Sequence, residues 1–221
     1  MRRKRMSVKA IVFDMDGLII DSERVIQMSW HIAGKELGYL HMDQDIYQTL
    51  GCNAKKRQLY FKATYGDDFP YETFLNRYRL EYQLYMETYG IPVKKGVYEL
   101  IAYAKQKGIK IAVATSSSRD SAFQSLSAIH ILEEFEVIVS GDMVKEAKPS
   151  PEIYQIACNM LKVNPADAIA LEDSLHGIRA AFDAGMKPIF VPDLIQDSSD
   201  IDHLLYHKCN DLIEVIQILE N

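Results

Sequence analysis

Short apolar runs alternate with helical patterns along most of the chain. The runs are near-continuous rather than alternately polar, which is typical of strands covered on both faces of a parallel sheet. They are Lys9–Phe13, Ile109–Thr115, Phe135–Val139, Asp167–Leu171 and Lys187–Val191. Helical patterns separate or follow them at about residues 96–107, 119–129, 150–162, 174–184 and 211–219. This order predicts an α/β fold with an open parallel sheet.

One long interval interrupts the alternation. From Glu23 to Tyr89 the chain shows helical periodicity and no convincing strand, with the clearest apolar stripe between Tyr71 and Tyr89. Nine of the 13 tyrosines fall in this interval, where we expect them mainly to pack between helices.

The interval predicts a discontinuous domain arrangement. Glycine and proline residues punctuate the chain after Tyr89, before the strand pattern resumes. We therefore expect residues 1–22 and 93–221 to form the sheet domain, and residues 23–92 to form an inserted helical module.

Composition and charge narrow the class of protein. The hydrophobic fraction of 48% excludes wholesale disorder, and three cysteines are too few for a disulfide scaffold. Five of the first ten residues are basic, and the remainder carries 20 basic and 31 acidic residues. Such an acidic body is a poor nucleic-acid binder, and no apolar run approaches the length of a membrane helix. We expect a cytoplasmic protein without nucleic-acid or membrane partners.

Two carboxylates follow the first apolar run. Asp14 and Asp16 are two residues apart, so on an extended backbone both project to the same side. Two carboxylates about 4 Å apart repel by roughly 4 kcal/mol at an effective dielectric constant near 20. A cation or a shared proton must offset this repulsion, unless the pair lies in a solvated loop.

Three further polar segments follow later parts of the strand pattern. Hydroxyl groups follow the second run at Thr115–Ser118, Lys148 lies between that region and the fourth run, and Glu172 and Asp173 follow the fourth run. The carboxyl ends of parallel strands meet at one sheet edge, where open α/β proteins bind ligands. We therefore expect the acids, hydroxyls and lysine to converge.

Read together, these segments resemble the haloacid dehalogenase-like superfamily of phosphotransferases. The matching residues are Asp14-Met15-Asp16-Gly17, the Thr115 motif, Lys148-Pro149-Ser150-Pro151 and Leu171-Glu172-Asp173-Ser174-Leu175-His176-Gly177-Ile178. The resemblance covers nearly the whole chain and is specific to the branch that contains β-phosphoglucomutase and small sugar-phosphate phosphatases. It implies a Rossmann-like parallel sheet core with an inserted all-helical cap.

The resemblance also implies catalytic roles. Asp14 would be the nucleophile that forms an aspartyl-phosphate, and Asp16 the general acid and then the general base. Thr115, the backbone N–H of Ser116, and Lys148 would hold the transferring phosphoryl oxygens.

A magnesium ion is implied at the same place. Its ligands would be Asp14, the backbone carbonyl of Asp16 and Asp173, with Glu172 acting directly or through water. Hard carboxylate oxygens suit Mg²⁺, and the histidines and cysteines are too dispersed to favour zinc.

Two departures from the mutase pattern favour hydrolysis of a small phosphomonoester. The mutase branch has a histidine early in the cap where this chain has Ile26, and two cations in a cap loop that here reads Gly51, Cys52 and Asn53 between Leu50 and Ala54. We expect these loop residues to affect substrate specificity. The basic run Lys55–Arg57 could supply substitute cations, so a β-phosphoglucomutase-like isomerase stays open.

A non-enzymatic alternative is a phospho-acceptor domain of the receiver type, which also groups acids, a hydroxyl and a lysine at a sheet edge. The chain length, the helical insertion and the close pairing of Asp14 with Asp16 disfavour it. We expect a small phosphorylated metabolite as the partner, and a monomer or weak dimer as the assembly.

Overall fold

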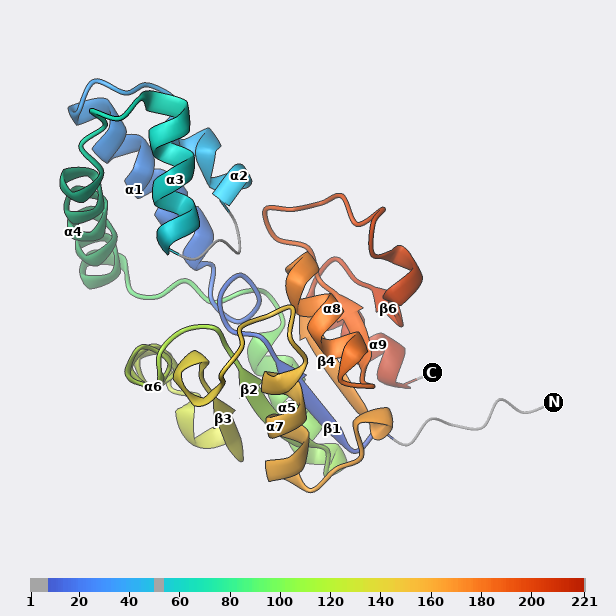
Figure 1. Ribbon diagram of the computed structural model, residues 1–221. Coiled ribbons are helices and arrows are strands. Elements are labelled where there is room, and N and C mark those ends of the chain that lie inside the picture. Colours follow the sequence, from blue (N-terminus) through green and yellow to red (C-terminus); the bar gives the residue numbers. More distant parts are fainter. Residues whose placement is uncertain (1–7, 50–53, 221) are drawn as a thin grey trace. The chain divides into compact units, whose positions relative to one another are not determined.

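The computed structural model describes residues 8–49 and 54–220. These residues divide into two compact units, and the chain passes between the units after Asp21 and again after Pro92. The first unit contains a sheet with helices, and the second is helical (Figure 1).

The first unit is built on a six-stranded parallel sheet of order β3-β2-β1-β4-β5-β6. Its strands are β1 (Ala10–Phe13), β2 (Lys110–Ala114), β3 (Val137–Val139), β4 (Ala168–Glu172), β5 (Lys187–Phe190) and β6 (His207–Lys208). All the pairings are parallel, so the predicted α/β fold is confirmed. Every residue of β1 and β4 is buried, which explains their unbroken apolar sequence.

The short edge strand β6 was missed by the sequence analysis. It consists of two exposed polar residues that pair with Ile189 and Phe190 of β5. A strand of this length on the exposed edge has no apolar face to bury, so it carries no hydrophobic pattern.

Helices cover both faces of the sheet. They are α5 (Val97–Lys107), α6 (Arg119–Ala128), α7 (Glu152–Leu161), α8 (Leu175–Asp183) and α9 (Leu212–Glu220). One face carries α7 and α8, whose buried Tyr154 and Ala180 join the core cluster that contains Ala10 and Val12 of β1. Ile11 and Phe13 alternate to the opposite face, on which α5 packs against β2 (Figure 1).

The strand order places a topological switch at the centre of the sheet. Successive strands proceed outward from β1 through β2 to β3, and then return beside β1 at β4 and proceed the other way. Ligands of open α/β sheets bind beyond the carboxyl ends of strands at such a point. The residues that follow β1, β2 and β4 are therefore placed for a functional site.

The second unit contains α1 (Ser22–Glu36), α2 (Ile46–Thr49), α3 (Ala54–Tyr65) and α4 (Tyr71–Tyr89), with α1 packed on α4. Trp30 is fully buried, with its ring edge-on to Phe61 and Phe74 at centroid distances of 5.3 and 5.6 Å. The expected packing of tyrosines between helices holds for Tyr78, whereas Tyr89 is 74% exposed.

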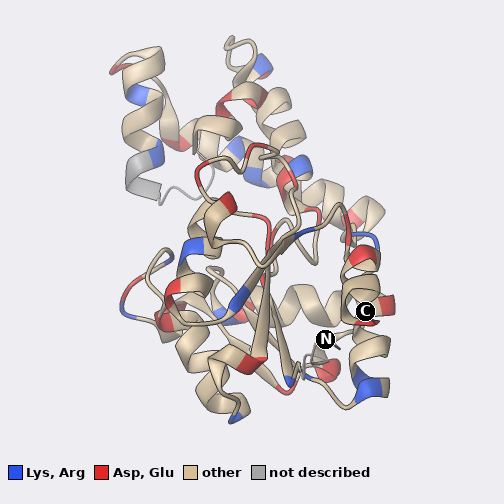
Figure 2. Ribbon diagram, turned by 90° about the vertical axis from the view of Figure 1, so that its right-hand side faces the viewer, with Lys and Arg blue, Asp and Glu red and all other residues tan. Residues whose placement is uncertain are grey.

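Charged residues of both signs are interspersed along the described chain (Figure 2). None of the described helices combines the length and apolar character needed to span a bilayer.

Candidate active site

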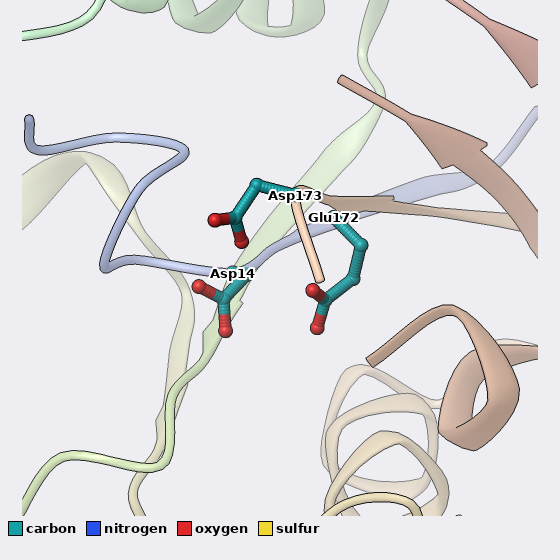
Figure 3. Close-up of side chains that lie close together, drawn as sticks. All are labelled: Asp14, Glu172 and Asp173. Atoms are coloured by element: carbon teal, nitrogen blue, oxygen red, sulfur yellow. The ribbon is translucent and has the colours of Figure 1, made fainter. Parts of the chain in front are cut away.

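Three carboxylates meet beyond the ends of β1 and β4. Phe13 pairs with Leu171, and the Asp14 amide donates a hydrogen bond to the Leu171 carbonyl at 2.9 Å. This register brings Asp14 beside Glu172 and Asp173 (Figure 3). Glu172 is fully buried, and Asp14 and Asp173 are each 7% exposed. Acids so deeply buried require compensating charge.

Lys148 supplies one compensating charge. Its ammonium group donates to Oδ1 of Asp14 at 2.5 Å, to Oε1 of Glu172 at 2.6 Å and to the Ala114 carbonyl at 3.1 Å. The lysine side chain is only 7% exposed. All three ammonium protons therefore have partners from β1, β2 and β4, and the expected convergence of lysine and acids is present.

The two partners of this ion pair respond differently to their surroundings. Burial raises the pKa of Asp14 to about 8; Lys148 opposes this shift, and the Glu172 charge adds to it. Burial alone would lower the pKa of Lys148, but the Asp14 and Glu172 carboxylates raise it. The lysine thus stays charged, while Asp14 holds its proton to a higher pH than an ordinary aspartate.

The donor set fits a hard divalent cation. One ligand oxygen from each of Asp14, Glu172 and Asp173 lies within 4.8 Å of the others. Opposite oxygen ligands of octahedral Mg²⁺ are roughly 4.2 Å apart, twice the metal–oxygen distance, so a small adjustment would suffice. With all three carboxylates ionised, the single ammonium of Lys148 would leave two negative charges, which a divalent cation balances.

Gly17 shapes the loop opposite Asp173. Its φ is +85°, and a Cβ atom built there would lie 2.1 Å from Oδ2 of Asp173. A residue with a side chain would strain the backbone and displace the carboxylate. The glycine therefore allows the β1 loop to approach the acids at the end of β4.

Asp16 lies in the same site but on the side of β2. Oδ2 of Asp16 accepts hydrogen bonds from the hydroxyls of Ser117 at 2.7 Å and Thr115 at 3.3 Å. The Ser117 amide donates to the Thr115 hydroxyl at 3.0 Å. Asp14 thus faces Lys148, whereas Asp16 faces hydroxyl groups, so the two carboxyl groups have distinct environments.

Of the remaining predicted site residues, only Ser116 lies within the part of the chain that the structure describes. Ser116 is exposed at the end of β2, and its carbonyl lies against Gly141, where an added Cβ would be 2.4 Å away. Gly51, Cys52 and Asn53 lie outside the described residues.

Two side chains that hold the site were missed by the sequence analysis. The buried Tyr154 hydroxyl donates to Oε1 of Glu172 at 2.6 Å, and its ring lies 5.1 Å from the Lys148 ammonium. Burial, followed by the charges of Glu172 and Asp14, raises the pKa of Tyr154, which keeps the hydroxyl a donor. Ser117 was noted only within a hydroxyl-rich segment, and nothing in that segment distinguishes it.

Ser174 and Gly177 complete the support of Glu172. The Ser174 hydroxyl donates to Oε2 of Glu172 at 2.9 Å and accepts from the Gly177 amide at 3.0 Å as the N-cap of α8. A Cβ on Gly177 would lie 1.8 Å from Oε1 of Glu172. A glycine inside a helix has a cost in stability, so its presence in the motif was a usable signal of close packing.

The fold, the buried lysine–carboxylate cluster and the order of the motifs define one class of protein. Residues 11–191 match the model of the haloacid dehalogenase-like hydrolase family, and the chain belongs to that family.

The chain is also similar to individual proteins from other organisms. The chain is 37% identical to protein CbbY of Cereibacter sphaeroides over 84% of each chain. It is 33% identical to the putative phosphatase YhcW of Bacillus subtilis, over 90% of this chain and 91% of the relative. A crystal structure of a CbbY variant from Rhodobacter sphaeroides in complex with xylulose-1,5-bisphosphate superposes with a TM-score of 0.76 at 30% identity, covering 94% and 96% of the two chains.

Proposed function

We propose that this chain is a Mg²⁺-dependent phosphatase that hydrolyses a small phosphomonoester, with a sugar phosphate as the substrate class. The observation that carries the proposal is the buried Lys148–Asp14 ion pair beside Glu172 and Asp173. The names of the relatives support it, since one is a putative phosphatase and another has been crystallised with a sugar bisphosphate.

In the first step, a carboxylate oxygen of Asp14 attacks phosphorus and forms the aspartyl-phosphate. The bond between phosphorus and the substrate oxygen breaks, and Asp16 gives its proton to that leaving oxygen. Lys148 stabilises the Asp14 carboxylate and the phosphoryl oxygens in this step. Thr115 and the Ser116 amide, at the end of β2, bind the same oxygens.

In the second step, Asp16 removes a proton from water as the water oxygen attacks phosphorus. The bond between phosphorus and Asp14 breaks, which releases inorganic phosphate and restores the Asp14 carboxylate. Asp16 then holds a proton again and is ready for the next substrate. Its hydroxyl partners Ser117 and Thr115 hold the carboxyl group in place without supplying a competing charge.

Magnesium would be held by Asp14, Asp173 and the backbone carbonyl of Asp16. When bound, it neutralises charge on the phosphoryl group and on the acids. Glu172 belongs to the same group of carboxylates, and Lys148, Tyr154 and Ser174 already donate to its oxygens. We therefore assign Glu172 to water-mediated binding and to the placement of Lys148.

The helical unit would act as a cap domain. We propose that the two passages of the chain, at residues 20–23 and 89–96, are its hinges. A hinged cap admits substrate and then excludes bulk water from the phosphoryl transfer. Gly51, Cys52 and Asn53, which lie outside the described residues, are proposed to contribute to specificity.

Isomerisation of a phosphosugar is the alternative chemistry. We prefer hydrolysis because the sequence Leu50–Asn53 has no lysine or arginine to capture a second phosphate. Of the following basic run, Arg57 places its guanidinium over the Trp30 ring at 5.7 Å, within the helical unit. A cytoplasmic location and a monomeric or weakly dimeric state stay predictions.

The proposal is tested with a panel of phosphomonoesters that includes pentose and hexose phosphates and xylulose-1,5-bisphosphate. We expect release of inorganic phosphate with Mg²⁺, none with excess EDTA, and none from Asp14→Asn. Conversion of β-glucose 1-phosphate to glucose 6-phosphate without phosphate release would instead establish the isomerase. No turnover of any compound in the panel would contradict both.

A further inference from the structure

A second buried charge cluster lies beside the proposed metal ligands. Asp193 follows the end of β5, and its side chain is fully buried. Oδ1 of Asp193 accepts a hydrogen bond from the Lys94 ammonium at 2.6 Å. The lysine side chain is itself only 20% exposed. A buried acid paired with a mostly buried lysine is costly to retain for stability alone, and none of the catalytic steps above uses either residue.

Asp193 is a neighbour of Asp173. The end of β5 is bonded to the end of β4 through the Val191 amide, which donates to the Glu172 carbonyl at 2.7 Å. Carboxylate oxygens of Asp193 and Asp173 lie within 4.8 Å of each other. Asp193 is therefore a neighbour of both Lys94 and Asp173, and Asp173 is a proposed magnesium ligand.

Lys94 also lies where the chain passes between its two units. Its amide donates to the Ile19 carbonyl at 2.9 Å, and its ammonium is 3.9 Å from Oδ1 of Asp21. Asp21 and Lys94 each lie within two residues of a boundary of the sheet unit. One lysine thus links both passages of the chain to the β5 end of the site.

We propose that Asp193 is a positioning residue for the metal site, which anchors Lys94 so that Asp173 stays available to Mg²⁺. The inference rests on the proposed function. An unanchored Lys94 has a long, flexible side chain that can rotate toward Asp173, and an ammonium group paired with a carboxylate competes with a metal ion for it. Outer residues of this kind commonly change metal affinity by about 10- to 100-fold.

The decisive variant is Asp193→Asn, which keeps the size of the side chain and removes the anchor charge. Isothermal titration of the metal-free protein with MgCl₂ gives the readout, and thermal unfolding of the same samples checks the fold. We expect the dissociation constant for Mg²⁺ to rise about tenfold. The double variant Lys94→Met/Asp193→Asn also removes the competing cation. Its dissociation constant for Mg²⁺ should therefore return to within about threefold of the wild-type value.

The neighbouring pair Lys95–Asp211 provides a matched control. It has the same 2.6 Å separation, but Lys95 is 76% exposed and Asp211 lies at the start of α9. Asp211→Asn should leave Mg²⁺ binding unchanged.

Three results would overturn the inference. In the first, Asp193→Asn loses thermal stability but binds Mg²⁺ as the wild type does. In the second, the double variant binds as weakly as the single one. The double variant contains no unpaired buried charge from this pair, so its titration decides the matter even where Asp193→Asn does not fold. In the third result, Asp211→Asn weakens Mg²⁺ binding as much as Asp193→Asn does. A wild-type protein that binds no Mg²⁺ would instead contradict the proposed function.

Discussion

The Lys148 ammonium group lies 2.5 Å from Oδ1 of Asp14, although 134 residues separate the two in the sequence. The sheet makes this contact possible, because Asp14 directly follows the central strand β1 and the lysine reaches it across the end of β2. The same ammonium bonds Glu172, so one cation serves two buried acids. Removal of that cation should disrupt the site more than removal of any single hydroxyl.

Lys148→Met is expected to lower kcat by at least about 10²-fold, the scale for loss of an electrostatic stabiliser of a transition state. Steady-state phosphate release measures the effect. Circular dichroism and gel filtration verify that the variant is folded. A variant that is folded and retains near wild-type turnover would show that Lys148 has no part in phosphoryl transfer.

Tyr154→Phe is expected to reduce stability by about 1.5–3 kcal/mol, the range for a hydrogen bond to a charged group. The change removes only the hydroxyl that donates to Glu172. Urea unfolding measures this loss of stability. Tyr98→Phe is the matched control, because the Tyr98 hydroxyl makes a longer bond of 3.3 Å to a carbonyl and the residue is 50% exposed. Equal losses in the two variants would contradict a special role for Tyr154.

Gly17→Ala is expected to weaken Mg²⁺ binding, because the new Cβ would displace the Asp173 carboxylate. Gly38→Ala separates this effect from backbone strain. Gly38 has φ of +84°, close to the +85° of Gly17, and nothing within 4 Å of its Cβ position. Both variants should lose about 1–2 kcal/mol of stability through the left-handed backbone. Only Gly17→Ala should change magnesium affinity; if both or neither do, the steric explanation is wrong.

Magnesium affinity is expected to depend on pH through Asp14. The metal-free folded protein holds the pKa of this carboxyl at about 8, above its ordinary value of 3.8. The proton is therefore retained as pH falls below 8, and a metal ion must displace it. We expect the dissociation constant to rise toward about tenfold per pH unit below 8, with uptake of Mg²⁺ releasing a proton. Calorimetry between pH 6 and 9 tests this prediction. A dissociation constant for Mg²⁺ that does not change across that range would refute it.

The raised pKa of Asp14 also makes the stability of the folded protein depend on pH. The unfolded chain loses the Asp14 proton near pH 3.8, whereas the folded metal-free protein keeps it to about pH 8. Asp14 therefore lowers the free energy of unfolding of the metal-free protein as the pH rises from 4 to 8. Magnesium should reverse that loss, and a larger Mg²⁺-induced rise in Tm at pH 8 than at pH 6 is the expected signature.

The positions of Asp14, Glu172 and Asp173 could be anticipated because each follows an apolar run, and parallel strands bring their ends together. Lys148 follows no apolar run directly, and the resemblance of Lys148-Pro149-Ser150-Pro151 to the family motif is what pointed to it. Tyr154 could not be anticipated, because it occupies a buried position of α7 that any large apolar residue could fill, and only the three-dimensional contact with Glu172 distinguishes it. Asp193 did carry a signal. It follows the fifth apolar run as Asp14 follows the first, but no motif drew attention to it.

The environment of Asp16 also needed the structure. Its two-residue spacing from Asp14 predicted a shared side, and both do lie in one site. The hydroxyl contacts of Asp16 depend on how the chain turns after β2, which the segment Thr115–Ser118 does not specify.

Asp16→Asn is expected to bind substrate while its turnover of a sugar phosphate falls by at least about 10²-fold, because the proton donor and base are lost. The asparagine carbonyl can still accept from Ser117, so the site should keep its shape. Near-normal turnover would refute the role proposed for Asp16.

The central claim is that Asp14 carries the phosphoryl group, and Asp16→Asn allows it to be tested. With p-nitrophenyl phosphate the leaving group needs no proton, so the first step proceeds and the second lacks its base. We expect acid quenching in the presence of Mg²⁺, followed by peptide mass spectrometry, to find a phosphoryl group on Asp14. Release of p-nitrophenol during steady turnover with no phosphoryl group on Asp14 would contradict the account.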